Sequence, residues 1–134
     1  MKKLALAAAL LLTSCGFFKD PNEPSERVLR PTAAVVNDFP PNAASMTAEQ
    51  WLQQSLYYHK QSRYLECIAA AQTALFLKPD FAEAWNNIGV AYSALHLWDL
   101  AIQAETQAVR LKPNFELAKN NIVWAQTQKQ RGVK

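Results

Sequence analysis

The stretch that decides the fold is Ala82–Phe115, AEAWNNIGVAYSALHLWDLAIQAETQAVRLKPNF. A shift of 34 residues aligns it with Ala48–Phe81, AEQWLQQSLYYHKQSRYLECIAAAQTALFLKPDF. The matching positions are Trp51 with Trp85, Tyr58 with Tyr92, Ile68 with Ile102, Ala74 with Ala108, and LKPDF with LKPNF. A fixed period of this length predicts one repeated supersecondary unit, whose apolar faces are buried when neighbouring units stack.

Each unit is expected to hold two helices, and a third unit keeps only its first helix, with NNI at 86–88 aligned to NNI at 120–122. Thr47 with Gln50 has the pattern of a capping box, and Asp80 with Glu83 repeats it one unit later. The proline of each LKP motif ends the second helix. The predicted helices are 48–61, 64–77, 81–95, 98–111 and 115–129. The last one has a polar end, as the solvent-facing cap of a repeat array should have.

This pattern resembles the tetratricopeptide (TPR) repeat. The period is 34, and the spacing of Trp85, Gly89 and Tyr92 is that of a first TPR helix. The family's later positions follow at Ala101, Ala108 and Pro113. The resemblance implies an all-α solenoid of helical hairpins in a domain spanning 47–131. It contains repeats 48–81 and 82–115 and a capping helix over 115–130.

The first repeat departs from the TPR pattern, and the departures carry structural expectations. Gln54 and Ser55 replace the usual Leu-Gly pair, and Ser55 is small enough to fit between helices. Cys67 replaces alanine at a packing position, so we expect a buried, inert thiol. Ser62 and His96 stand in turns where the family usually has glycine, so these turns are expected to be strained or of another type.

The N-terminus reads MKKLALAAALLLTSC over residues 1–15. Its apolar run of nine residues is too short to cross the ~30 Å of a bilayer core and has the length of a signal-peptide apolar region. The segment Leu12–Cys15 resembles a bacterial lipobox. That resemblance implies a signal peptide over 1–14, acylation of Cys15 with palmitate-like chains, and a lipid-anchored protein of the cell envelope. In a Gram-negative host, Gly16 after the cysteine implies the outer membrane, facing the periplasm. A secretory signal that happens to contain a cysteine is the alternative.

Residues 15–46 are expected to form the lipidated cysteine and a tether, because five of the seven prolines lie between 16 and 46. Each proline removes a donor and disfavours helical backbone before it, so an extended linker is predicted. A second interpretation is a strap that packs on the helical domain through its apolar residues Val28, Leu29, Val35, Val36 and Phe39.

The TPR resemblance places candidate partner-binding residues on the first helix of each unit, which lines a concave groove in that family. Gln53, Asn87 and Asn121 are one period apart and could form an amide ladder, since a side-chain amide pairs with both backbone groups of an extended peptide. The alternative is that these amides are merely solvated. The same face would carry Leu52, Leu56, Asn86, Val90, Asn120 and Trp124. Trp124 has the character of a binding hot spot, although a neighbouring segment could also cover it.

Other function classes find little support in the sequence. The two histidines are 37 residues apart and lack spaced metal-ligand partners, so no metal site, cofactor or enzyme activity is expected. The formal charge of +3 argues against a dedicated nucleic-acid binder. Two cysteines exclude a disulfide framework.

The sequence therefore predicts a membrane-anchored TPR lipoprotein that binds a protein or peptide partner in its groove. The alternative is a structural accessory of an envelope assembly, similar to a pilotin or an export-machine lipoprotein. Because three or more repeats are usually needed for stability, a homo-oligomer is also possible.

Overall fold

The computed structural model describes residues 39–132, and all regular structure in this range is helical. A short 3₁₀ turn, η1 (Ala43–Ser45), precedes the α-helices. These are α4 (Ala48–Lys60), α5 (Tyr64–Leu77), α6 (Ala82–Ala94), α7 (Trp98–Leu111) and α8 (Glu116–Gln130). The prediction of an all-α fold is confirmed for the described residues. The helices α5 and α7 have the predicted bounds, and the other ends differ by at most one residue.

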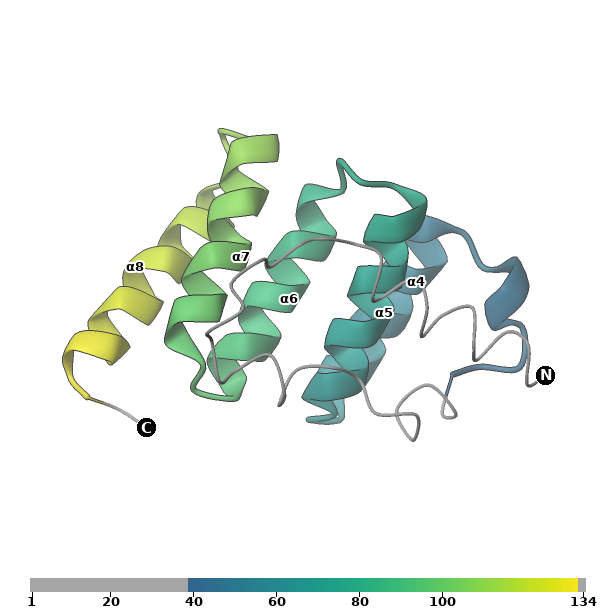
Figure 1. Ribbon diagram of the computed structural model, residues 1–134, viewed down its shortest axis with the longest axis horizontal. Coiled ribbons are helices and arrows are strands. Elements are labelled where there is room, and N and C mark those ends of the chain that lie inside the picture. The colour runs from purple at the N-terminus through teal and green to yellow at the C-terminus, as the bar shows by residue number, and fades with distance from the viewer. Residues whose placement is uncertain (1–38, 133–134) are drawn as a thin grey trace, which may run out of the picture.

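The helices lie in a row in the order of the chain (Figure 1). Each helix from α4 to α7 packs against the next one. The alternate helices also contact one another, α4 with α6 and α6 with α8. Matching positions of α4, α6 and α8 therefore fall along one side of the row.

Contacts between the helices recur at the 34-residue spacing of the sequence. Lys78 Nζ lies 3.3 Å from Glu49 Oε1, and Lys112 Nζ lies 2.9 Å from Glu83 Oε1. Each of these lysines also lies over the ring of the phenylalanine three residues later, at 4.5 and 4.9 Å from the centroid. The alignment of the sequence with itself thus corresponds to a repeated arrangement in space.

The turns inside the two helix pairs are strained, as predicted. Ser62 has φ 58° and His96 has φ 60°, and they are equivalent residues one period apart. A side chain in this left-handed region costs of the order of 1 kcal/mol, which a glycine would avoid.

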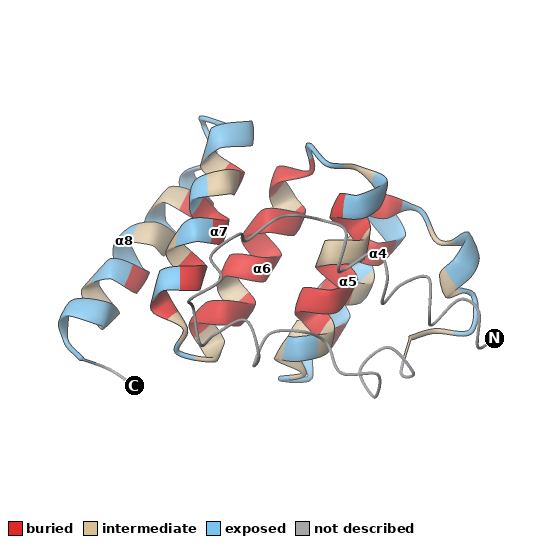
Figure 2. Ribbon diagram, in the orientation of Figure 1, coloured by how far each residue is buried: buried red, intermediate tan, exposed pale blue. Residues whose placement is uncertain are grey.

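The core combines aromatic residues of the first helices with small residues of the second helices. Trp51, Tyr58, Trp85 and Tyr92 are buried. The second helices bury Cys67, Ala70, Ala71 and Ala74 on α5 and Ala101, Ala104 and Ala108 on α7. Small side chains allow the helix backbones to approach closely, and the burial is concentrated on α5 and α6 (Figure 2).

The start of α4 confirms the first predicted capping box. Gln50 N–H donates to Thr47 Oγ1 over 3.3 Å, and Thr47 N–H donates to Gln50 Oε1 over 2.8 Å. The second predicted box is wrong, because the N-cap of α6 is Phe81, whose side chain cannot accept a hydrogen bond. Asp80 lies one residue before the cap, in the turn that follows Pro79, and the Glu83 carboxylate binds Lys112 instead.

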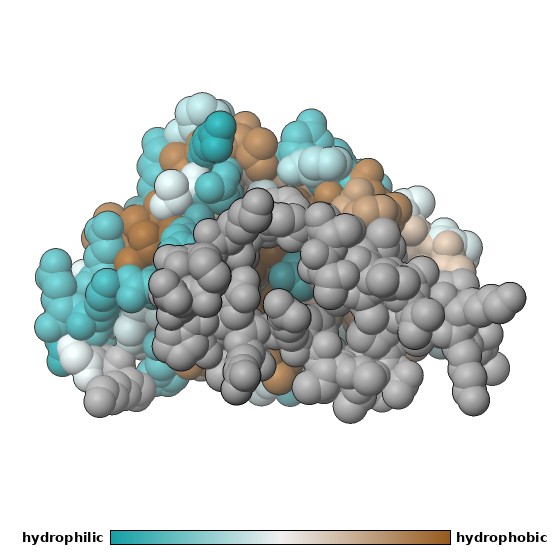
Figure 3. Space-filling model, viewed as in Figure 1, coloured by the Kyte–Doolittle hydropathy of each residue, from teal (hydrophilic) through white to brown (hydrophobic). Residues whose placement is uncertain are grey.

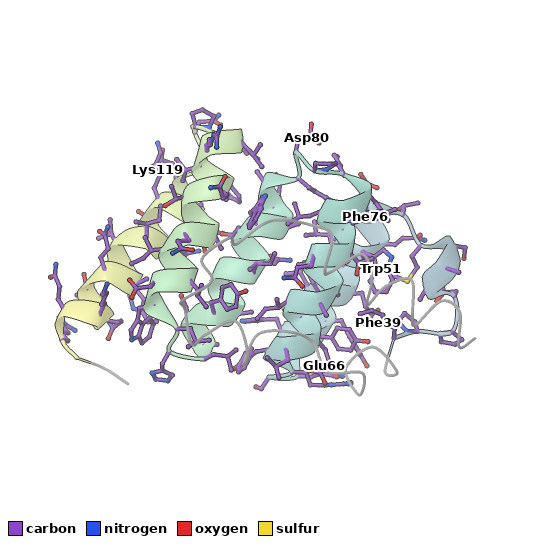
Figure 4. The ribbon with its side chains drawn as sticks, viewed as in Figure 1. Phe39, Trp51, Glu66, Phe76, Asp80 and Lys119 are labelled. Atoms are coloured by element: carbon purple, nitrogen blue, oxygen red, sulfur yellow. The ribbon has the colours of Figure 1, made fainter. Side chains whose placement is uncertain are left out.

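The segment before α4 packs on the helical domain. The ring of Phe39 meets the ring of Trp51 edge-on, with 4.8 Å between centroids (Figure 4). Ala43 and Met46 also pack against the core. For residues 39–46, packing therefore replaces the expected extended tether. The other predicted strap residues, the signal peptide over 1–14 and Cys15 lie outside the described residues.

The other end of the row is polar, as predicted for a cap. Gln126, Lys129, Gln130 and Arg131 are exposed. Hydrophilic surface prevails around α8, with hydrophobic patches between (Figure 3). Within residues 39–132, no helix combines the length and hydropathy that a membrane span requires.

Candidate partner-binding face

The face formed by α4, α6 and α8 carries the predicted binding residues, but they differ in accessibility. Gln53, Leu56 and Asn120 are exposed, while Leu52 and Val90 are partly buried. Trp124 is 49% exposed, and Leu117, one turn before Asn121 on α8, is 56% exposed. Of the predicted apolar residues, Leu56 on α4 and Trp124 on α8 therefore lie at the surface. By contrast, Asn86 and Asn87 are buried.

The side chain of Asn87 forms a hydrogen bond at the junction between α6 and α4, where the two helices pack together. Its Nδ2 donates to Ser55 Oγ over 2.7 Å, and that hydroxyl donates to the carbonyl oxygen of Leu52 over 2.7 Å. The carbonyl oxygen of Asn87 accepts a weak bond from Cys67 Sγ at 3.9 Å. The side chain thus joins two helices of the fold.

Asn121 is committed in the same way one period later. Its Nδ2 donates to Asn86 Oδ1 over 3.1 Å and to Glu105 Oε1 over 2.9 Å, joining α8 to α6 and α7. The expectation of a free amide ladder through Gln53, Asn87 and Asn121 is therefore wrong, because the amide nitrogens of both asparagines already have internal acceptors. Only Gln53 is left exposed.

Glu105 is the residue that the sequence analysis missed. Its side chain has 0% exposure, in the middle of α7. It lies against Gly89 of α6, where an added Cβ would come within 2.6 Å of Glu105 Cγ and 2.7 Å of Oε1. The first unit has Ser55 and Ala71 at these two positions. The signal in the sequence was this pair of exchanges: a serine becomes glycine on the first helix while an alanine becomes glutamate on the second.

Burial changes the acid–base chemistry of Glu105. Removal from water raises the pKa of this carboxyl to about 8, and the hydrogen bond from Asn121 opposes the rise only in part. Its second oxygen, Oε2, is buried and has no hydrogen-bond partner among the described residues. The group therefore carries a proton at neutral pH.

Cys67 confirms the expectation of an inert thiol. Its side chain is fully buried, and burial raises the pKa of the thiol to about 12. A thiol that stays protonated is neither a nucleophile nor a metal ligand.

The histidines do not form a site with each other. His59, near the end of α4, has its ring centroid 5.5 Å from that of Tyr64. His96, in the turn between α6 and α7, has its ring centroid 5.2 Å from that of Trp98. Within residues 39–132, no three His, Cys, Asp or Glu side chains group as metal ligands.

Trp124 is held at one edge and open on the rest of its surface. Its ring meets the ring of Trp98 edge-on, with 5.4 Å between centroids. Trp98 itself is buried at the start of α7. The contact fixes the orientation of Trp124 without covering it.

Comparison of the chain with models of known families and with curated proteins gives no match.

Proposed function

We propose that this chain is a TPR-type protein-interaction module, held at the cell envelope by a lipid on Cys15. The 34-residue period, the recurring lysine–glutamate pairs and the equivalent turns at Ser62 and His96 support the TPR assignment. The lipobox resemblance of residues 12–15 supports the anchor. Together they describe an adaptor rather than a catalyst.

The partner that suits this face is an amphipathic helix. One observation supports this proposal: the side-chain amides of Asn87 and Asn121 form hydrogen bonds inside the fold, while apolar residues of the same face are exposed. An extended peptide needs donors and acceptors for its backbone, whereas Asn87 is buried and Asn121 Nδ2 already donates to two internal oxygens. A helix satisfies its own backbone and presents apolar side chains every three or four residues, which match exposed Leu56, Leu117 and Trp124.

Site-specific photo-crosslinking in cells tests this proposal. A photoreactive residue placed at Leu56 or Asn120 is expected to capture the same partner, at positions spaced by three, four or seven residues along that partner. Gln103, exposed on α7, is the matched control position and should capture it poorly. Equal capture from Gln103 would contradict a binding face on α4, α6 and α8. Capture at alternate partner residues would point to an extended peptide instead.

A structural accessory of an envelope assembly is the second candidate, and the lipobox-like segment favours it. In that case placement at the membrane matters more than the binding face. Cys15→Ala would then abolish the activity of the envelope assembly. Trp124→Ala would leave that activity, and the proteins that crosslink to the chain, unchanged. If the binding face is essential, Trp124→Ala alone should remove the partner.

Self-association is a further possibility for so short a repeat array. Light scattering on the full chain in detergent measures it directly. A dimer that Leu117→Lys disrupts would place a second copy on the proposed face. A monomer would leave that face to another protein.

A further inference from the structure

The terminal helix α8 is attached through an unusual set of contacts. Its buried residues are Ala118 and Ala125, whereas α6 buries large side chains such as Trp85 and Tyr92. Two alanines contribute little apolar area to the packing of a helix. The Trp98–Trp124 ring contact adds apolar packing between α7 and α8, and Asn121 adds the hydrogen bonds that join α8 to α6 and α7.

One of the two acceptors of Asn121, Glu105 Oε1, is in place because the Glu105 side chain reaches across Gly89. The glycine leaves room for the carboxyl between α6 and α8, at the distances that exclude a Cβ. Asn121 then bridges Glu105 Oε1 on α7 and Asn86 Oδ1 on α6. Three helices thus meet at one buried carboxyl.

We propose that the Glu105 carboxyl, in its protonated form, is a latch that holds α8 on α6 and α7, and that loss of this proton releases α8. A carboxylate at this place would bury a charge with one hydrogen bond from Asn121 and an unpaired second oxygen. Water can reach it when α8 leaves, because α8 lies at the end of the row of described helices and packs mainly on α7, with a smaller contact to α6. Release would remove Leu117, Asn120 and Trp124 from the binding face, and this consequence alone rests on the proposed function.

Among the described residues, no neighbouring charge offsets the cost of burying a charged Glu105 carboxylate. On α6, Glu83 is paired with Lys112, and Tyr92 stays protonated because burial raises its pKa to about 12. On α8, Glu116 is paired with Lys119.

The remaining charged groups of these helices are also engaged elsewhere or lie at the surface. Lys129 of α8 pairs with Asp99 of α7, and Arg110 of α7 is exposed. The Glu105 carboxyl responds to burial and to Asn121 alone, so its pKa of about 8 supports titration at mildly alkaline pH.

Hydrogen exchange of the full chain in detergent tests the latch. Protection of α8, relative to α4 and corrected for the intrinsic exchange rate, is expected to fall roughly 10- to 100-fold between pH 6 and pH 9. The opening equilibrium changes up to tenfold for each pH unit between the ordinary glutamate pKa and the shifted pKa of about 8, and it levels off above that value. Glu105→Gln has the same shape and no titrating proton, so its α8 should stay protected at both pH values. Glu116→Gln, at an exposed site of α8, is the matched control and should behave as the unmodified chain.

Two results would overturn the proposal: constant protection of α8 in the unmodified chain, or equal loss in Glu105→Gln. A carbon-13 NMR titration of the Glu105 carboxyl in the unmodified chain gives a second reading that needs no variant. A midpoint near 8 supports the latch, and a midpoint near the ordinary 4.5 contradicts it. Neither measurement involves a partner, so a failure here is distinguishable from failure of the proposed function.

Discussion

Asn87 of α6 and Asn121 of α8 are equivalent residues, and each donates its amide to a buried oxygen of the helices before it. At the first junction, the oxygen belongs to Ser55 on α4. At the second junction, it belongs to Glu105 on α7, because the position equivalent to Ser55 is Gly89. At the second junction Asn121 also donates to Asn86 Oδ1 on α6, so α7 supplies an acceptor that has no equivalent at the first junction.

This difference shows what a repeat can vary. A neutral hydroxyl is satisfied at the first junction, since it accepts from Asn87 and donates to the Leu52 carbonyl. The carboxyl of the second junction is ionisable and has one unpaired oxygen. The two junctions are therefore packed at equivalent positions but differ in their ionisable groups, and only the second junction should respond to pH.

The pH dependence of stability is the largest expected effect. The pKa of Glu105 is raised from 4.5 in the unfolded chain to about 8 in the fold, so the folded state holds the proton more tightly. Its stabilising effect is complete below pH 4.5, is lost progressively as the pH rises from 4.5 to 8, and amounts to about 5 kcal/mol at about 1.4 kcal/mol per pH unit. Urea unfolding at several pH values measures this loss. It should vanish in Glu105→Gln and persist in Ser55→Ala, which alters only the first junction.

Exchange of the two junction chemistries is the next test. Gly89→Ser alone should lower the free energy of unfolding by about 1–3 kcal/mol, because its Cβ would overlap the Glu105 side chain. Addition of Glu105→Ala recreates the Ser55–Ala71 pair of the first unit. The double variant should recover most of the free energy of unfolding that Gly89→Ser loses. A double-mutant cycle measured by chemical denaturation gives the coupling. Additive effects would contradict the idea that the two positions exchange roles.

Removal of the asparagine amides should be unequal at the two junctions. Asn121→Ala leaves the buried Glu105 carboxyl without its donor and is expected to cost about 2 kcal/mol. Asn87→Ala costs about 1 kcal/mol, because Ser55 keeps its bond to the Leu52 carbonyl. Thermal or urea unfolding of the two variants compares them. A larger loss for Asn87→Ala would reverse the ranking of the junctions.

The surface ion pairs are expected to have the smallest effect. The hydrogen bond from the Lys112 ammonium lowers the pKa of Glu83. The pair therefore stabilises the fold above the ordinary glutamate pKa, and this stabilisation is lost as the pH falls and the carboxylate is protonated. Both side chains are largely exposed, and Lys112→Ala should cost at most about 0.5 kcal/mol, less at high salt. Lys78→Ala is the matched variant in the first unit. An effect independent of salt would show that lysine packing on the phenylalanine ring matters more than charge.

Local signals were enough to place most helices. The bounds of α5 and α7 follow from the repeat and the LKP motifs, and Thr47 with Gln50 correctly indicates the cap of α4. The same pattern at Asp80 and Glu83 gave a wrong prediction, because the N-cap of α6 is Phe81 and not Asp80. A side-chain cap depends on the register of a single residue, and the packing of Phe81 in the core decides that register.

Of the residues predicted for the binding face, some are exposed and others are used inside the fold, as Asn87 and Asn121 are. Leu56 and Trp124 are exposed as a binding face requires. The asparagine pattern has two readings in sequence, solvent-facing or bridging between helices, and both have the same spacing. Contact with Ser55 and Glu105, distant in sequence, selects the bridging arrangement.

The sequence by itself determined the 34-residue period, the helical class and the buried, inert character of Cys67, because these depend on short-range pattern and side-chain size. Only the tertiary structure decided where the polar groups go. Glu105 would be assigned to the surface from its charge alone, and it is buried because Gly89 leaves a space and Asn121 supplies a donor. Such a site exists only when three helices have come together, so no local pattern could have specified it.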